Sequence, residues 1–349
     1  MNQLSRSLLN RRLIGIVDPC CPRPYESGDP GDRGLGGTEA TVLRIVQALR
    51  HEFRFTLFQN RRSEVRRAGS VVYRPLDQAD AVGMLDGLVV INSWKLACRL
   101  RRRHRDVPVC LWLHVHPGRH NRPMGRALHR HGIGVLCVSK SHASALRRFL
   151  AGDAVPVIES IYNPLAEDLA PDETRRDPDL LVFASSPHKG LREVFSTFAS
   201  VRAEIPSLRL EIADPGYLAW DCGPPPQGAR FLGTLPHRET IRQMRKSLCL
   251  FYPQTRFAET FGLVIAEANA VGTPALVHRG LGANDEVVSS PDQLVDAADP
   301  GAVLSAIRRW RASAPQISGR PEFRLSSVTD RWRDHLDRLL AQSPMEIDA

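Results

Sequence analysis

The chain has 349 residues, a length that favours two domains. Hydrophobic residues make up 42% and charged residues 24%, a balance typical of a globular enzyme that excludes a disordered or membrane-spanning chain. The net charge of +9 favours anionic partners, among them nucleotides, phosphorylated acceptors, anionic lipid headgroups and nucleic acid. Seven cysteines are scattered without metal-ligand spacing, so we expect reduced thiols.

The first half of the chain alternates short apolar runs with longer segments of helical period. The basic residues 1–12 precede an apolar run too short for a signal peptide or a membrane span, which predicts a cytoplasmic protein. The alternation is typical of parallel sheets covered by helices, so the predicted fold class is α/β. The predicted strands are residues 13–17, 55–58, 88–91, 109–114 and 135–138, and the predicted helices are residues 38–49 and 141–150.

A glycine-rich loop lies between the first predicted strand and the first predicted helix. Residues 31–39 include Gly31, Gly34, Gly36 and Gly37. The loop lacks the third glycine of the dinucleotide-binding pattern GxGxxG and lies well beyond the strand, so it does not fit that fingerprint. Taken alone, it is explained equally well as a flexible connection.

A cluster of arginines follows Trp94 in residues 94–105, WKLACRLRRRHR. This pattern predicts a basic, partly amphipathic element that attracts an anionic acceptor or the inner face of a membrane. A peripheral membrane contact is therefore one expectation, and a solvated arginine-rich helix is the alternative.

Histidines cluster at the end of the strand predicted at residues 109–114. Alternation along a strand puts His114 and His116 on one face. No carboxylate or cysteine completes a metal site there, so we expect no metal. The alternative to a functional histidine is one that is bonded to neighbouring backbone.

Residues 168–179, rich in Pro, Asp, Glu and Arg, predict an exposed linker. We place Rossmann-like domains at residues 1–165 and 166–325, and a terminal helix in residues 326–349, for which packing back across the domains is one option. Ligands bind outside the carboxyl ends of the strands in such sheets, so functional residues are expected there.

The second half repeats the pattern of the first, with strands predicted at residues 180–184, 208–213, 230–232, 249–252 and 275–278, and helices at residues 191–204, 239–246, 263–271 and 328–340.

The strongest functional pattern lies in residues 248–278. It predicts a buried strand, a loop, a helix at residues 263–271 and another strand, with Thr260 as the helix N-cap. The free N–H groups and the positive dipole end of such a helix bind phosphate groups, and Gly262 permits a close approach.

Two glutamates lie near the start of this helix. Glu259 precedes the helix and Glu267 lies inside it. Carboxylates beside a diphosphate accept hydrogen bonds from sugar hydroxyls, which would assign Glu267 to a ribose and Glu259 to a transferred sugar. The alternative is that Glu259 only favours the helix dipole and that Glu267 is a solvated helix residue.

The stretch ETFGLVIAEA at residues 259–268, followed by AVGTP, resembles the E-x7-E signature of retaining glycosyltransferases of family four, which have the GT-B fold. The resemblance spans about residues 13–290. Further pieces resemble the family in the same order, namely the glycine turn LGGTE at residues 35–39, Asn163 in IYNP, Lys189 in HKG, the FLG strand at residues 231–233 and Glu286.

The resemblance implies a GT-B fold of two Rossmann-like domains that face a central cleft, and retaining transfer of a hexosyl or related sugar. The donor would be a nucleotide diphosphate sugar bound mainly by the second domain. The acceptor hydroxyl, on a saccharide, a lipid-linked molecule or a small molecule, is not identified by the sequence. No cofactor, metal or nucleic-acid partner is expected.

The resemblance also implies residue roles. Lys189 would neutralise the leaving diphosphate, and His114 or His116 would contact the donor sugar or the acceptor. One departure is Ala184, which stands where the family has an arginine, so either Arg192 replaces it or donor binding is weaker. Further contacts to the donor would come from Glu259, Glu267, Thr260, Phe261, Gly262, Leu263, Gly36 and Gly37.

Other functions stay open at this point. An epimerase or a phosphorylase would use the same scaffold, because fold does not fix chemistry, and Ala184 leaves room for a catalytically silent homologue. A basic nucleic-acid-binding protein is less favoured, since the aromatic content is only 6% and no binding module is recognisable.

Overall fold

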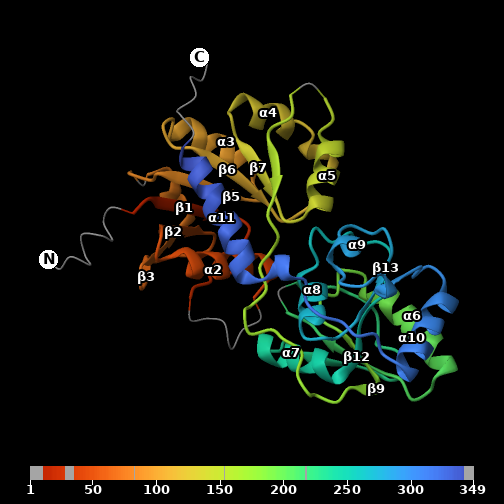
Figure 1. Cartoon of the computed structure of the whole chain (residues 1–349). Helices are drawn as coiled ribbons and strands as arrows, with labels where there is room; N and C mark the ends of the chain where they lie inside the picture. The colour runs from red at the N-terminus through yellow and green to blue at the C-terminus, as the bar shows by residue number, and fades with distance from the viewer. Residues whose placement is uncertain (1–10, 28–34, 82, 153, 217, 342–349) are drawn as a thin grey trace. The chain divides into compact units, whose positions relative to one another are not determined.

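The computed structural model describes residues 11–27, 35–81, 83–152, 154–216 and 218–341 (Figure 1). Contacts between residues divide the chain into two compact units. Most of the predicted basic N-terminus, together with Gly31 and Gly34, lies outside the described residues. Unit 1 comprises Met1–Ser27, Thr41–Pro164 and Leu325–Ala349, and unit 2 comprises Gly28–Ala40 and Leu165–Arg324.

Unit 1 contains an eight-stranded sheet in its described part, with the order β3-β4-β2-β1-β5-β6-β7-β8. All neighbouring strands are parallel except β3 and β4. The strands are β1 (Leu13–Asp18), β2 (Arg54–Gln59), β3 (Arg66–Ala68), β4 (Val71–Pro75), β5 (Gly87–Ile91), β6 (Val109–Leu113), β7 (Gly134–Cys137) and β8 (Ile158–Ser160). The helices are α2 (Gly37–Leu49), of which the residues up to Ala40 belong to unit 2, η1 (Leu76–Asp80), α3 (Trp94–Arg103), η2 (Arg119–Asn121), α4 (Met124–Arg130), α5 (Lys140–Phe149) and α11 (Leu325–Leu340).

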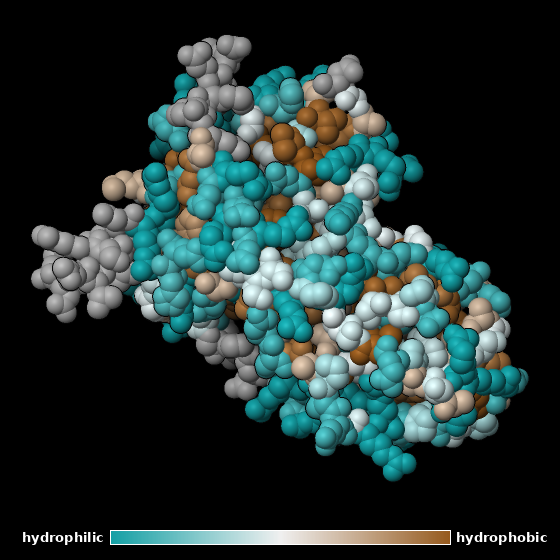
Figure 2. All heavy atoms as spheres, viewed as in Figure 1, coloured by the Kyte–Doolittle hydropathy of each residue, from teal (hydrophilic) through white to brown (hydrophobic). Residues whose placement is uncertain are grey.

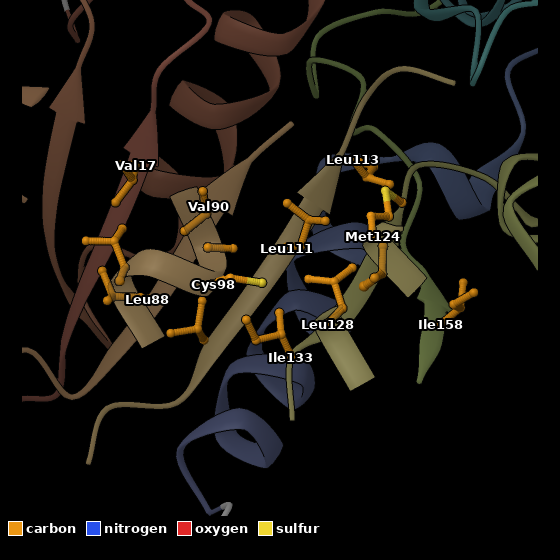
Figure 3. Packing of buried hydrophobic residues seen from close by; sticks show 14 of the residues in the cluster. Val17, Leu88, Val90, Cys98, Leu111, Leu113, Met124, Leu128, Ile133 and Ile158 are labelled. Carbon is orange, nitrogen blue, oxygen red and sulfur yellow. The ribbon is translucent and has the colours of Figure 1, made fainter. Parts of the chain in front are cut away.

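Apolar side chains on both faces of this sheet are buried, as expected for a parallel sheet covered by helices. On one face, Leu88, Leu111 and Leu128 belong to a cluster that joins the sheet to α3 and α4 (Figure 3). Successive strand residues point to opposite faces, so Trp112 lies on the other face, where its ring centre is 4.5 Å from that of Trp332 in α11. The sheet is therefore covered from both sides.

Unit 2 contains a six-stranded parallel sheet in its described part, with the order β11-β10-β9-β12-β13-β14. The strand order reverses between β9 and β12, so the loops after these two strands flank the point where doubly wound sheets bind ligands. The strands are β9 (Asp177–Phe183), β10 (Arg209–Ala213), β11 (Ala229–Gly233), β12 (Ser247–Tyr252), β13 (Ala275–His278) and β14 (Leu294–Val295). The helices are α6 (Leu191–Glu204), α7 (His237–Lys246), α8 (Leu263–Ala270), α9 (Asn284–Val287), η3 (Pro291–Gln293), α10 (Pro300–Ala312) and η4 (Pro321–Phe323).

The predicted α/β class is confirmed, and two predicted boundaries are wrong. The strand predicted at residues 109–114 ends at Leu113, so the alternation argument does not extend to His114 and His116. The stretch predicted as a linker, residues 168–179, is coil only up to Arg176, because β9 begins at Asp177.

The basic segment is helical over α3, and several of its cations make contacts inside unit 1. Arg99 forms an ion pair with Asp80 at 3.0 Å, and Arg103 donates a hydrogen bond to the Asp80 backbone. Arg101 is buried and donates to the carbonyl oxygens of Arg105 and Val107. Much of this positive charge therefore holds the end of α3 in place.

Hydrophilic residues cover most of the face shown in Figure 2. In the part of the chain that the structure describes, no helix is both long enough and apolar enough to cross a membrane. The seven cysteines are all free thiols, and five of them, including Cys110 and Cys137, are far less exposed than Cys20.

Candidate functional site

Lys189 lies in the turn between β9 and α6 in unit 2. The next residue, Gly190, is the N-cap of α6 and has φ of 89°, a left-handed conformation that favours glycine. A Cβ atom at Gly190 would lie 2.6 Å from Cβ of Gln254, in the loop after β12. This close approach brings the loops after β9 and β12 together at the reversal of strand order.

Glu259, in the loop after β12, is the partner of Lys189. The residue is only 5% exposed. Nζ of Lys189 donates to Oε1 at 3.0 Å and to Oε2 at 3.1 Å, and the hydroxyl of Tyr252 donates to Oε1 at 3.0 Å. Nζ of Lys189 also lies 4.9 Å from the ring centre of Phe257. The buried charge of Glu259 is therefore compensated by a cation and a hydroxyl.

The backbone of Glu259 is held by the loop after β13. Its carbonyl oxygen accepts a hydrogen bond from N–H of Ala283 at 2.9 Å. Gly282 has φ of 58°, and a Cβ atom there would lie 2.5 Å from that same oxygen. The position of Glu259 thus depends on a glycine that the sequence pattern did not single out.

The start of α8 differs from the prediction. The N-cap is Gly262, with φ of 87°, and not Thr260, because the chain needs a left-handed turn before the helix begins at Leu263. The side chain of Phe261 is buried, with its ring centre 5.1 Å from that of Phe323, so only its backbone is available to a ligand. A Cβ atom at Gly37 would lie 3.6 Å from Cδ2 of Leu263, so these two predicted residues are close together.

Glu267 is a buried residue of α8 and is 6% exposed. Its Oε1 lies 2.9 Å from Nε2 of His237, the first residue of α7. The alternative of a solvated helix residue is therefore wrong for Glu267. The structure brings a histidine and a carboxylate together at the amino-terminal end of α7.

In unit 1, His114 follows directly after β6 and is buried against Trp112, with ring centres 4.5 Å apart. Its backbone N–H donates to Oδ1 of Asn92 at 2.7 Å. Burial, together with the nearby His142, lowers the pKa of His114 to about 3. His114 is therefore a neutral imidazole at pH 7.

His116 is exposed, in contrast to His114, and its ring centre lies 4.9 Å from that of His142. His142 is buried, with N–H of Val138 donating to Nδ1 at 3.4 Å and Nε2 lying 3.2 Å from the carbonyl oxygen of Val115. Burial, with the adjacent His116, lowers the pKa of His142 to about 3. The loop after β6 thus rests on a neutral histidine at the start of α5.

Gly36 lies just before α2, and the carboxylate of Glu39 folds back against it in the space that a Cβ atom would occupy. N–H of Ala40 donates to the carbonyl oxygen of Gly36 at 3.0 Å. The glycine turn is therefore packed and not an open connection.

A cavity of about 550 Å³ in unit 1 lies away from these residues. Pro108, Ile133 and Val157, among its lining residues, come just before β6, β7 and β8. It therefore opens at the amino-terminal edge of the sheet, whereas His114 lies at the carboxyl edge.

Residues 173–316, a segment shorter than half of the chain, match the family model described as "Glycosyl transferases group 1". Unit 2 contains a glycosyltransferase group 1 domain. Lys189, Glu259 and Glu267 lie inside the matched segment of this domain, whereas Gly36, Gly37, His114 and His116 lie outside it. No curated protein sequence matches the chain.

The group 1 domain is part of a chain that is similar in fold to solved glycosyltransferase structures. A UDP-forming α,α-trehalose-phosphate synthase from Burkholderia vietnamiensis is 14% identical, with a TM-score of 0.67 over 95% of this chain and 99% of that one. AviGT4, a glycosyltransferase involved in avilamycin A biosynthesis, is 16% identical, with a TM-score of 0.59 over 95% and 99%. The pneumococcal O-GlcNAc transferase GtfA, in complex with UDP and GlcNAc, is 13% identical, with a TM-score of 0.54 over 81% and 64%. With its two α/β units, the chain has the GT-B fold.

Arg192, the candidate replacement for an arginine at position 184, lies in the first turn of α6 in the group 1 domain. Its guanidinium is 3.9 Å from the carboxylate of Asp221 and donates to the Asp221 carbonyl oxygen at 3.5 Å. The structure therefore directs Arg192 toward the loop after β10. In the described part of the chain, no three His, Cys, Asp or Glu side chains are grouped as metal ligands.

Sequence reasoning missed Tyr252 and His237, which contact the two glutamates in the group 1 domain. His237 lies 30 residues before Glu267, whereas Tyr252 lies only 7 residues before Glu259, at the end of the buried strand β12. It also missed Asp18 in unit 1. The Asp18 carboxylate accepts hydrogen bonds from N–H of Cys20 and Cys21, at 3.0 Å each, and burial raises its pKa. The available signal was a carboxylate directly after a buried strand, at the edge where ligands bind.

Proposed function

We propose that this protein is a retaining glycosyltransferase that transfers a sugar from a nucleotide diphosphate sugar to an acceptor hydroxyl. The observation that carries the proposal is the contact between Lys189 and Glu259. These residues come from the loops after β9 and β12, which flank the reversal of strand order in the group 1 domain. At that point a cation is available for the diphosphate, and a buried carboxylate is available for the hydroxyls of the sugar that is bonded to it.

Groups of the protein are assigned to three parts of the donor: the diphosphate, the transferred sugar and the ribose. The ammonium of Lys189 and the N–H groups at the start of α8 bind the diphosphate. Glu259 accepts hydrogen bonds from hydroxyls of the transferred sugar, and Glu267 accepts them from the ribose. UDP in the complex of the pneumococcal O-GlcNAc transferase, which shares the fold, supports a nucleotide as the ligand.

The reaction needs no enzyme nucleophile. The bond between C1 of the sugar and the diphosphate oxygen breaks, and the acceptor oxygen forms a bond to C1 on the same face. The acceptor proton passes to the leaving diphosphate, whose growing charge Lys189 stabilises. The expected products are a nucleoside diphosphate and a glycoside with the anomeric configuration of the donor, and no metal is required.

The residues of unit 1 are assigned to the acceptor or to the donor sugar. Because the pKa of His114 is about 3, this histidine can donate or accept a hydrogen bond at pH 7 but cannot act there as a cationic acid. His116 is the exposed partner in this role. Gly36 and Gly37, which belong to unit 2, offer backbone N–H groups to the diphosphate or the acceptor.

The test combines product analysis with binding. UDP-, GDP-, ADP- and TDP-sugars are screened for turnover, and the anomeric configuration of the product is read by NMR. Glu259→Gln should lower kcat more than it weakens nucleotide binding, because its contact strengthens as the sugar bond breaks. Glu267→Gln should weaken binding of the nucleoside diphosphate by up to about a hundredfold, the equivalent of a charge-assisted hydrogen bond.

Lys189→Ala should reduce both turnover and nucleotide binding. Since it leaves Glu259 buried without its cation, its folding must be checked by thermal unfolding. Glu204→Gln is the matched control, because Glu204 ends α6 at the opposite edge of the sheet and is exposed. If both site glutamate variants bind nucleotide and turn over like the parent, the assignment is wrong. An inverted product, or epimerisation without an acceptor, would replace it with another reaction.

A further inference from the structure

Trp220 is a large aromatic side chain with an unusual degree of exposure. Of the five tryptophans in the sequence, Trp112, Trp310 and Trp332 are buried and Trp94 is half-buried, whereas 58% of the Trp220 surface is exposed. Trp220 lies in the loop that follows β10, at the carboxyl edge of the unit 2 sheet and next to the loop after β9. Exposed apolar surface beside a site is typical of a ligand contact.

Ring contacts join Trp220 to the candidate site. The ring of His188 lies 6.0 Å from that of Trp220 and 5.5 Å from that of Phe257, edge to face in both cases. Phe257 in turn contacts the ammonium of Lys189, which is bonded to Glu259. Trp220, His188 and Phe257 therefore form a continuous row, here called the aromatic shelf, that ends at the ion pair.

Polar groups border the aromatic shelf. Asp221, the neighbour of Trp220 in sequence, is exposed and lies 3.9 Å from the exposed Arg192. Glu193 lies 3.4 Å from Arg256, which precedes Phe257. A pyranose ring presents C–H groups on its face and hydroxyls around its rim. The exposed indole of Trp220, bordered by carboxylates and guanidinium groups, is complementary to both.

We propose that the aromatic shelf is a saccharide subsite, in which Trp220 stacks against the face of a pyranose ring. The inference deepens the proposed function and rests on it for the orientation of the donor. In the proposed orientation of the donor, Glu267 binds the ribose, and the nucleobase lies beyond it. The aromatic shelf ends at Lys189 and Glu259, on the sugar side of the diphosphate. The stacked ring belongs either to the donor sugar or to an acceptor saccharide.

The fluorescence of Trp220 tests the subsite directly, because an exposed indole emits at longer wavelength and is quenched by acrylamide. The difference between the parent and Trp220→Phe isolates this emission. The full chain is titrated with UDP, GDP, ADP and TDP, then with the corresponding glucose, N-acetylglucosamine and mannose donors, and then with the free sugars and their disaccharides.

The expected result is that a pyranose-bearing ligand protects Trp220 from acrylamide and that the nucleoside diphosphates do not. Protection by a nucleotide sugar assigns the ring to the donor, and protection by a free saccharide alone assigns it to the acceptor. Trp220→Ala should weaken binding of that ligand about tenfold, a typical aromatic contribution, and leave nucleoside diphosphate binding unchanged. Trp220→Phe should retain most of the affinity for that ligand. Trp94→Phe, in unit 1, should change neither the binding of that ligand nor the binding of nucleoside diphosphate.

Two outcomes would overturn the subsite. One is equal protection by nucleoside diphosphate and nucleotide sugar, which means that the shelf stacks a nucleobase. The other is no protection by any pyranose-bearing ligand. The proposed function fails separately, if nucleotide binding and turnover do not depend on Lys189. Free saccharides still test the aromatic shelf in that case.

Discussion

Two glycines in the loop after β13 have left-handed backbone angles, but they differ in what surrounds them. Gly280 has φ of 75°, and a Cβ atom there would have no neighbour within 4 Å. Gly282 has φ of 58°, and a Cβ atom there would lie 2.5 Å from the carbonyl oxygen of Glu259 and 2.7 Å from its backbone nitrogen. An alanine at Gly280 would therefore cause backbone strain alone, whereas an alanine at Gly282 would cause strain and also displace Glu259.

Both Gly280→Ala and Gly282→Ala should lose about 1 to 2 kcal/mol of unfolding free energy, because alanine in the left-handed region is strained. Gly282→Ala should lose more, and it should also impair donor turnover, since the loop that carries Glu259 must move. Urea unfolding and turnover of the two variants measure this. Equal losses of stability with equal turnover would show that the backbone of Glu259 tolerates the displacement.

At this scale the sequence singled out two glutamates and one lysine as candidates, but it did not predict how they are bonded. The E-x7-E pattern depends on local rules for a strand, a loop and a helix, and these rules predicted the first residue of α8 but not its N-cap, which is Gly262. The partner of Glu259 is Lys189, 70 residues earlier, and the partner of Glu267 is His237, 30 residues earlier. Such pairs depend on the order of strands in the sheet, which a single sequence does not contain.

Helix and strand boundaries were predictable wherever local signals were strong. The helix predicted at residues 191–204 is α6, because Gly190 starts it and its apolar residues recur with helical spacing. α10 was missed although its signals were present. Asp299 caps it by accepting a hydrogen bond from N–H of Gly301 at 2.8 Å, and Pro300 occupies its first position.

The short hairpin of β3 and β4 was not predicted, and here the sequence holds little signal. Arg66 and Arg67 make up most of β3 and are exposed, so no apolar alternation marks the strand. Its pairing with β4 is the one antiparallel pair in the described part of unit 1. Edge strands of this kind are defined by their neighbours and not by their own residues.

α11 is attached to unit 1 by contacts along its length. Trp332 packs edge-on against Trp112. Arg333 pairs with Glu52, and the His335 ring and the Arg338 guanidinium lie 3.0 and 3.2 Å from Glu159. The buried indole pair is the apolar contact among these, so it should dominate the energy.

Trp332→Ala should lower the unfolding free energy of unit 1 by about 3 to 5 kcal/mol, the usual cost of removing a buried aromatic side chain. Asp334→Ala, two residues away and exposed, is the matched control and should change it by less than about 0.5 kcal/mol. Urea unfolding followed by circular dichroism measures both variants. A loss below about 1 kcal/mol for Trp332→Ala would mean that α11 contributes little to the stability of unit 1.

At the scale of the whole molecule, the main part of unit 2 is a continuous stretch between two parts of unit 1. The chain enters it at Leu165 and leaves it at Arg324, and these two residues form a parallel bridge. N–H of Leu165 also donates to the carbonyl oxygen of Phe323 at 2.8 Å. The two ends of this stretch are therefore adjacent.

A fragment of residues 165–324 should fold alone, because it carries the whole six-stranded sheet and α6 to α10. It should unfold cooperatively and bind nucleoside diphosphate through Lys189 and Glu267, with affinity reduced by loss of the segment around Gly37. Thermal unfolding and calorimetric titration of the fragment measure this. A broad, non-cooperative transition would show that residues 28–40 are required for the fold.

The attachment of α11 to unit 1 has a consequence for synthesis on the ribosome. Domains generally fold as units in the order in which they emerge, but unit 1 cannot finish in that order. Its last helix is made after the whole of the stretch at residues 165–324, and until then the sheet face that carries Trp112 lacks its cover. The second unit to begin is thus the first that can be completed.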